Sequence, residues 1–145
     1  MSEHRATVEW KLSGEFKPES YSRVHAIRFG DVEVPGNAAP GNIPTTVPAA
    51  AGVDPEEQFV ASLSSCHMLW FLYLASVKKW VVERYVDEAV GVLDKTWVSR
   101  VTLRPKVTFS GQAPSTQEQQ ALHHRAHEKC FIANSVKSEV VIEPC

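Results

Sequence analysis

The 145-residue sequence has no excess of charge of either sign and no apolar signal segment at its start. Fifteen basic side chains oppose 17 acidic ones, for a formal net charge of -2. Such a balance does not favour nucleic acid or an anionic membrane surface as a partner. Without a signal segment, the expected location is the cytoplasm. Internal repeats are also absent, so we expect one domain over residues 1–145, long enough to bury a core.

Cysteine is scarce, and Cys66, Cys130 and Cys145 are the only three. They are too few and too widely spaced for a secreted disulfide scaffold or a zinc site. A glycine-rich phosphate loop and a G-x-S-x-G motif are missing as well. In a reducing compartment, a pair of cysteines more often has a catalytic or redox role than forms a structural disulfide. The competing interpretation is that the cysteines are small buried hydrophobic residues.

Residues 58–77 contain no Asp, Glu, Lys or Arg, whereas acids precede them and two lysines follow. This order of charges suits a helix macrodipole. Asp54 is suited to the N-cap and Pro55 to the first helical position. We therefore predict a helix over residues 55–79, apolar on nearly every face and buried on all sides. Its length would also suit a membrane span, but polar side chains in its first half favour a core helix.

Alternating apolar residues predict strands before and after this helix. These strands are expected over residues 6–16, 21–29, 32–34, 85–94, 97–103, 106–109 and 135–143. The Pro- and Gly-rich residues 35–53 predict a long loop. Ser115 and Glu118 form a capping-box signature that opens a second helix of roughly sixteen residues. Antiparallel strands segregated from helices predict an α+β domain, with the central helix covered further by a second copy in a homodimer.

The cysteines of the two predicted helices lie on faces that pack inward, so Cys66 and Cys130 could meet. The nearby histidines give weaker signals. His123 and His127 are spaced to chelate a metal from one helix face, together with His124, but no further ligands at zinc-like spacing follow, so a solvated face is favoured. His67 adjoins Cys66, yet neighbours on a helix point about 100° apart, so no Cys–His dyad is expected.

The run at residues 54–59 (DPEEQF), leading to SSCH at residues 64–67, resembles the OsmC/Ohr family of osmotically inducible and organic hydroperoxide resistance proteins. That family is marked by a Pro-Glu pair near the start of a central helix and a reactive cysteine further along it. Cys130 falls at the family's second cysteine position, and the residues after Cys66 look more similar to the OsmC-like branch. One departure is that Phe131 stands where better-known members carry proline.

This resemblance implies a thiol peroxidase in which Cys66 attacks an organic hydroperoxide and Cys130 resolves the resulting sulfenic acid. A dithiol would restore the pair, and no metal or bound organic cofactor would be needed. The resemblance further implies an intertwined homodimer. The alternative is a non-catalytic dimeric stress-response or ligand-binding relative whose cysteines only pack.

A cation is expected beside the reactive thiol, because nearby positive charge favours the thiolate. By resemblance, this cation is an arginine from the N-terminal region held by the Glu of the Pro-Glu pair. Arg23 and Glu56 match these positions best, and Arg28 is the rival of Arg23. Glu56 and Cys66 are ten residues apart, which is about 15 Å along an unbroken helix.

Overall fold

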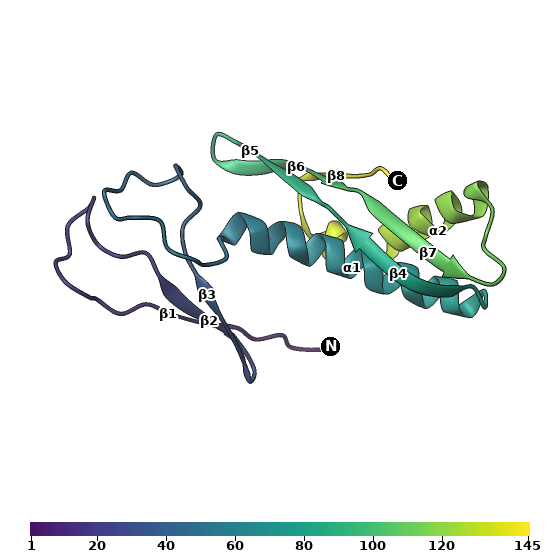
Figure 1. Ribbon diagram of the computed structural model, residues 1–145, viewed down its shortest axis with the longest axis horizontal. Coiled ribbons are helices and arrows are strands. Elements are labelled where there is room, and N and C mark those ends of the chain that lie inside the picture. The colour runs from purple at the N-terminus through teal and green to yellow at the C-terminus, as the bar shows by residue number, and fades with distance from the viewer. The chain divides into compact units, whose positions relative to one another are not determined.

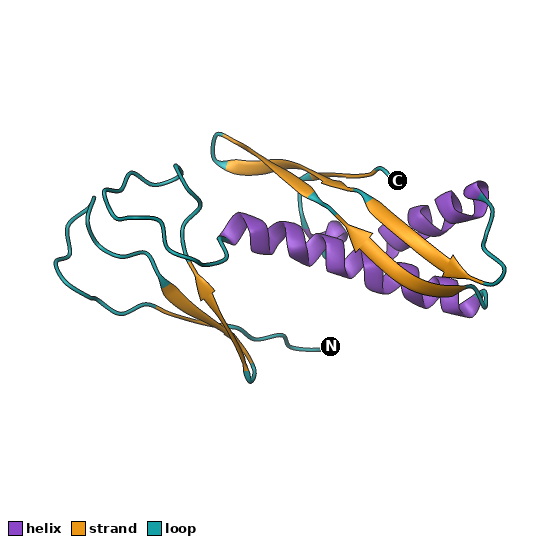
Figure 2. Cartoon of the chain, viewed as in Figure 1, coloured by secondary structure: helices purple, strands orange, loops and turns teal.

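The computed structural model describes all residues, 1–145, and divides them into two compact units, Met1–Gln58 and Phe59–Cys145. Figure 2 shows helices together with several separate groups of strands, which confirms the α+β class.

The first unit holds one three-stranded antiparallel sheet in the order β1 (Thr7–Glu9), β2 (His25–Phe29) and β3 (Val32–Gly36). A tight turn joins β2 and β3, and Gly30 takes a φ of +61° there, which glycine adopts without steric cost. The first two strands are shorter than predicted. The segment between these strands does not continue their pairing. Its aromatic side chains contact one another instead: Trp10, Phe16 and Tyr21.

Helix α1 (Pro55–Val77) begins where the sequence predicts, at Pro55 after an Asp54 cap. The Asp54 Oδ1 accepts the Glu57 N–H at 2.7 Å, and the Glu57 carboxylate accepts the Asp54 N–H at 3.1 Å. This reciprocal capping box satisfies two of the N–H groups that a helix start leaves free.

The helix ends two residues earlier than predicted, at Val77. Lys79 takes a left-handed φ of 61°. Its N–H bonds the Ser76 carbonyl, and the Trp80 N–H bonds the Ala75 carbonyl. This pair of bonds is a Schellman motif, which turns the chain out of the helix.

The second unit contains two sheets. Strand β4 (Val81–Asp87) pairs antiparallel with β7 (Pro105–Ser110). The other sheet has the order β5 (Val90–Asp94), β6 (Trp97–Leu103), β8 (Glu139–Ile142), and β8 runs parallel to β6. The prediction of antiparallel strands throughout is therefore wrong for β8. A long crossover through helix α2 (Thr116–Lys129) separates β6 from β8, and such a connection permits parallel pairing.

Helix α2 starts at the predicted capping box, in which Ser115 and Glu118 exchange hydrogen bonds of 2.8 and 3.2 Å. Cys130 is its C-cap residue, and the short 3₁₀ helix η1 (Ala133–Ser135) follows. Leu122, Ala126 and Cys130 follow one another at intervals of four residues, and all three are buried.

The core of the second unit forms along α1. The second half of α1 packs on α2, β4 and β7, and Figure 1 shows these elements alongside it. Leu63, in the first half, packs on Val101 and Leu103 of the β5-β6-β8 sheet. Gly91 of β5 lies so close to this part of α1 that a Cβ there would meet the Val60 Cγ2 at 2.5 Å.

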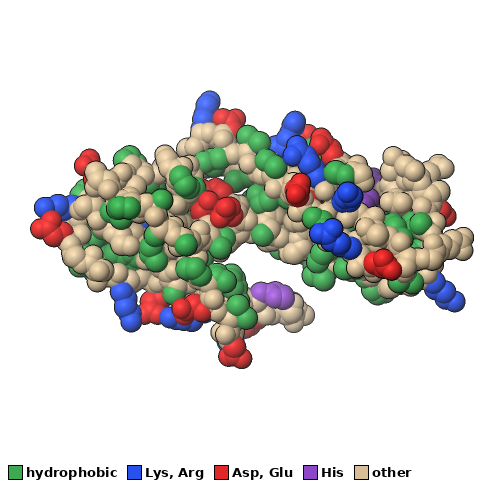
Figure 3. Space-filling model, viewed as in Figure 1, with side chains coloured by type: hydrophobic (Ala, Val, Ile, Leu, Met, Phe, Trp, Pro, Cys, Tyr) green, Lys and Arg blue, Asp and Glu red, His purple; other side chains and the backbone are tan.

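Helix α1 is buried on one face of the single chain rather than on all sides. Leu63, His67 and Phe71 are almost fully buried, whereas Leu69, Tyr73 and Val77 are 62%, 58% and 61% exposed. Hydrophobic side chains also reach the surface visible in Figure 3. By length and composition alone, α1 would suit a membrane span, a property it shares with core helices of soluble proteins.

Candidate active site

The structure brings Cys66 and Cys130 together. Cys66 lies near the middle of α1 and is half-buried, whereas Cys130 is buried at the end of α2. Cys66 lies close enough to Cys130 to influence the pKa of its thiol. The Ala133 N–H in turn donates to the Cys130 Sγ at 3.4 Å, which orients that sulfur. Both cysteines are free thiols in this arrangement.

The surroundings of Cys130 favour the protonated form of its thiol. Burial raises the pKa of the Cys130 thiol to about 11, and the neighbouring Cys66 thiol adds to the rise. The Ala133 N–H acts in the opposite direction. Cys130 is therefore protonated at neutral pH, so that of the two thiols it is the one suited to act second, on an oxidised partner, rather than as the first nucleophile.

An open pocket of about 520 Å³ adjoins Cys66. Its walls are mostly aromatic and aliphatic, and the lining consists of Cys66, Leu69, Trp70, Tyr73, Lys129 and Phe131. The Lys129 Nζ lies 5.3 Å from the centre of the Trp70 ring, a cation–π distance. Phe131, the departure from the family pattern, packs edge-on against Trp70 at 5.5 Å between ring centres. The pocket thus offers one charged group on an otherwise apolar wall beside a thiol.

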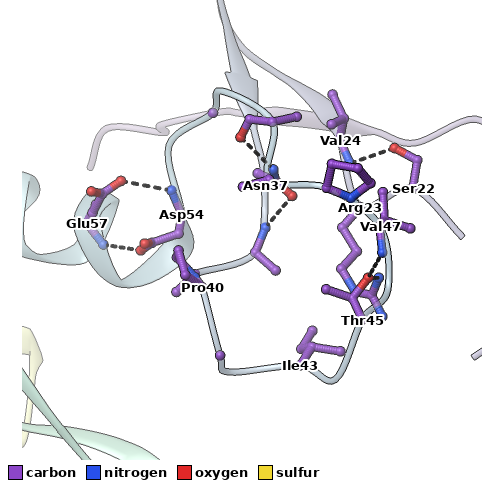
Figure 4. Close-up of a pocket in the computed structure, with 17 residues that line it drawn as sticks. Ser22, Arg23, Val24, Asn37, Pro40, Ile43, Thr45, Val47, Asp54 and Glu57 are labelled. Carbon is purple, nitrogen blue, oxygen red and sulfur yellow. Dashed lines mark hydrogen bonds between the residues drawn. The ribbon is translucent and has the colours of Figure 1, made fainter. Parts of the chain in front are cut away.

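Arg23 belongs to a different pocket, of about 400 Å³, formed within the first unit (Figure 4). Its guanidinium donates to the Thr45 hydroxyl at 2.7 Å and to the Pro18 and Pro44 carbonyls at 3.0 and 2.8 Å. It also lies 4.5 Å from the centre of the Tyr21 ring. Its Nε is buried without a partner. Arg23 therefore links two loop segments and keeps one donor free.

The expected Arg23–Glu56 ion pair is absent from the structure. Glu56 instead accepts a hydrogen bond of 3.1 Å from Asn42. The Arg23 guanidinium donates to the Pro18 and Pro44 carbonyls. Helix α1 is unbroken from Pro55, so Glu56 and Cys66 keep the predicted helical separation.

The rival Arg28 is engaged elsewhere. It forms ion pairs with Glu9 at 2.8 Å and with Glu33 at 2.6 Å, across the three strands of the first sheet. Hydrogen bonds to Glu9 first, and then to Glu33, raise the pKa of Arg28. Two carboxylates already compensate its charge, whereas no carboxylate pairs with Arg23.

A buried histidine pair was missed by the sequence analysis. The His67 Nε2 and the His123 Nδ1 are 3.0 Å apart, and only 1% and 3% of these residues are exposed. The prediction of a solvated histidine face is therefore wrong for His123, although it holds for His124, which is exposed. The available signal was the uncharged stretch around His67, since a histidine buried there needs a polar partner.

No group of three or more His, Cys, Asp or Glu side chains is arranged to hold a metal ion. His67 and His123 bind each other instead, with nearly parallel rings. The third cysteine, Cys145, is exposed at the C-terminus, and its backbone N–H bonds the Pro105 carbonyl at 3.0 Å.

The fold and the site together define a class of α+β proteins that carry two free thiols in contact, one on a central helix and one at the end of a second helix. Comparison with known proteins makes the assignment more specific. The family model described as OsmC-like protein matches residues 48–144. A search of the curated proteins gives no match.

Solved structures agree with this match. An OsmC-like protein of unknown function from Vibrio cholerae is 47% identical, with a TM-score of 0.94 over 100% of both chains. The organic hydroperoxide resistance protein OhrB of Bacillus subtilis is 17% identical, with a TM-score of 0.66 over 97% of this chain and 98% of its own. An organic hydroperoxide resistance protein OsmC from Legionella pneumophila is 19% identical, with a TM-score of 0.66 over 99% and 97%. The chain belongs to the OsmC-like family.

Proposed function

We propose that this protein is a thiol-dependent peroxidase that reduces organic hydroperoxides to alcohols, with Cys66 as the peroxidatic and Cys130 as the resolving cysteine. The observation that carries the proposal is that two free thiols lie next to each other beside an apolar pocket. The names of two structural relatives, both organic hydroperoxide resistance proteins, point to the same substrate class.

In the first step, the Cys66 thiolate attacks the distal oxygen of the hydroperoxide. An S–O bond forms as the O–O bond breaks, and the leaving alkoxide takes up a proton to become the alcohol. The sulfur is oxidised to a sulfenic acid by two electrons, which the peroxide accepts. The apolar wall of Leu69, Trp70 and Phe131 would hold an alkyl or aryl group next to the sulfur.

In the second step, the Cys130 sulfur attacks the sulfenic sulfur of Cys66. The new S–S bond forms as the S–O bond breaks, and the hydroxide leaves as water with the proton of Cys130. A dithiol then reduces the disulfide by two exchange reactions. A reducing compartment such as the cytoplasm supplies this class of reductant. No metal or organic cofactor takes part in either step.

Arg23 is the proposed cation that favours the Cys66 thiolate, since a guanidinium remains charged when buried. Its unpaired Nε and the absence of a carboxylate partner support this role. Glu56 is proposed as a residue that positions the loop around Arg23, because it holds Asn42 of the same loop.

The test is reduction of an organic hydroperoxide by Cys66→Ser in the presence of a dithiol. We expect complete loss of turnover with an unchanged circular dichroism spectrum, whereas Cys145→Ser, the matched exposed control, keeps its activity. Retention of most turnover in Cys66→Ser would overturn the assignment. An inert wild type, unreactive toward both hydroperoxide and alkylating agents at Cys66, would favour the non-catalytic relative.

Cys130 is tested by mass spectrometry of the oxidised protein. One equivalent of hydroperoxide should give an intramolecular Cys66–Cys130 disulfide in the wild type. Cys130→Ser should reduce the first equivalent, then accumulate sulfenic acid and over-oxidise with excess oxidant. A Cys66–Cys145 crosslink, or sulfinic Cys66 beside a reduced Cys130, would contradict the pairing.

A further inference from the structure

The buried pair His67–His123 is the only side-chain hydrogen bond between α1 and α2. His67 directly follows Cys66 on α1, and His123 lies two turns before Cys130 on α2. The two helices that carry the cysteines are thus joined by a specific polar bond. The rest of the contact between these helices is apolar, through side chains such as Phe71 and Leu122.

Several features make this bond persistent. The His123 ring stacks on Phe71 with 4.3 Å between ring centres, which fixes its plane. Burial lowers the pKa of His67 to about 3 and that of His123 to about 4, so both rings are neutral at physiological pH. In a neutral pair, one ring nitrogen donates its proton and the other accepts it. The remaining nitrogens, His67 Nδ1 and His123 Nε2, are buried without partners, so the pair has no alternative bond inside the protein.

Apolar packing alone is not directional, and it lets two helices slide or rotate by small amounts. A disulfide, by contrast, tolerates only a narrow range of Cα separations, about 4.4–6.8 Å. Helix α2 meets α1 at two points, His123 and Cys130, which lie about 10 Å apart along the axis of α2. Two such points define the direction of α2 as well as its distance from α1.

We propose that His67 and His123 form a clamp that holds α2 in the register in which Cys130 contacts Cys66, and that they are positioning residues for the disulfide. The clamp raises the effective concentration of one thiol at the other, because without it the reduced protein gains helix positions in which the sulfurs are apart. This proposal deepens the proposed function, since it concerns the resolving step. The predicted quantity, however, is an equilibrium between dithiol and disulfide that requires no peroxidase activity.

Two variants separate the hydrogen bond from the packing of the ring. His123→Phe keeps a ring that can stack on Phe71 but removes the bond. His123→Asn removes the ring but keeps a polar atom near the position of Nδ1. His124→Phe is the matched control, because His124 neighbours His123 on α2 and is exposed.

The experiment uses the full chain with Cys145→Ser, so that only Cys66 and Cys130 can pair. Each variant is equilibrated with reduced and oxidised dithiothreitol, quenched with an alkylating agent and analysed by mass spectrometry. We expect His123→Phe to lower the disulfide equilibrium constant by about five-fold, as the net effect of one buried hydrogen bond implies. His123→Asn should stay within about two-fold of the parent, because the bond remains. His124→Phe should leave the constant unchanged.

An unchanged constant in His123→Phe would overturn the clamp, and so would a lower constant in His123→Asn than in His123→Phe, because the ring would then matter more than the bond. Should His123→Phe fail to fold, His67→Gln and His67→Leu make the same comparison from α1, where Gln keeps a polar atom near Nε2. The titration contains no hydroperoxide, so a shift without peroxidase activity would support the clamp while rejecting the proposed function.

Discussion

At the scale of single residues, the sequence predicts that Cys66 and Cys130 could meet, and the structure shows that their surroundings differ. Cys130 is buried and keeps its proton, whereas Cys66 is half-buried beside an open pocket. Their meeting followed from the inward faces of two predicted helices. The surroundings of Arg23 could not be predicted, because they depend on the backbone carbonyls of Pro18 and Pro44 in two irregular segments, and backbone carbonyls carry no side-chain signal.

Replacing Arg23 with Ala should move the pH midpoint of alkylation at Cys66 upward, since a positive charge that favours the thiolate is removed. The measurement is the alkylation rate of the reduced protein as a function of pH. Arg28→Ala is the control, because Arg28 is already paired with two carboxylates. If the midpoint moves in Arg28→Ala and stays fixed in Arg23→Ala, the role belongs to Arg28.

At the scale of helices and strands, local chemistry predicted most of what was found. Both helix starts carry capping boxes that are visible in the sequence, at Asp54 and Ser115. The parallel pairing of β8 was not predictable, because alternation gives a strand but not the direction of its neighbour. The burial of His123 was missed for a related reason. It depends on a partner 56 residues away in the chain, which no local pattern reports.

Gly91 provides a test of how closely β5 approaches α1. Gly91→Ala should lower the free energy of unfolding by about 1–3 kcal/mol, the usual effect of overpacking, because its Cβ would meet Val60. Urea denaturation followed by circular dichroism measures the change. In the Val60→Ala background the same substitution should cost much less. Equal costs in both backgrounds would show that the contact does not limit the packing.

At the scale of the whole molecule, the histidine pair links stability to acidity. His67 and His123 have folded pKa values of about 3 and about 4, against an ordinary value of 6.5. The unfolded chain therefore binds more protons below pH 6.5, and stability falls as the pH decreases from 6.5 toward 4. Each histidine should contribute a slope of about 1.4 kcal/mol per pH unit within this window.

Urea titrations between pH 7 and pH 4 measure that slope. His123→Phe should make it shallower, and His124→Phe should leave it unchanged, because His124 is exposed. An equal slope in the wild type and in His123→Phe would contradict the assignment of acid sensitivity to the pair.

The exposed apolar stripe on α1 predicts assembly. We expect a homodimer at micromolar concentration in light scattering, because Leu69, Tyr73 and Val77 leave a continuous hydrophobic strip on one helix. Val77→Glu should weaken the dimer by placing a charge in this strip. Val81→Glu makes the same change at similar exposure on β4 and should have a smaller effect. A monomer with unchanged helix content would refute the prediction.

The end of α1 also bears on how far this chain can be improved. Lys79 and Lys95 both hold left-handed backbone conformations, with φ of 61° and 56°. For a residue with a Cβ, such a conformation costs about 1–2 kcal/mol, which glycine avoids, although glycine loses more entropy on folding. Lys79 and Lys95, which do not line the pocket beside Cys66, are therefore two positions where the free energy of unfolding could be raised. Substitution of glycine at these two turns is expected to raise the thermal stability without changing a residue of the pocket beside Cys66.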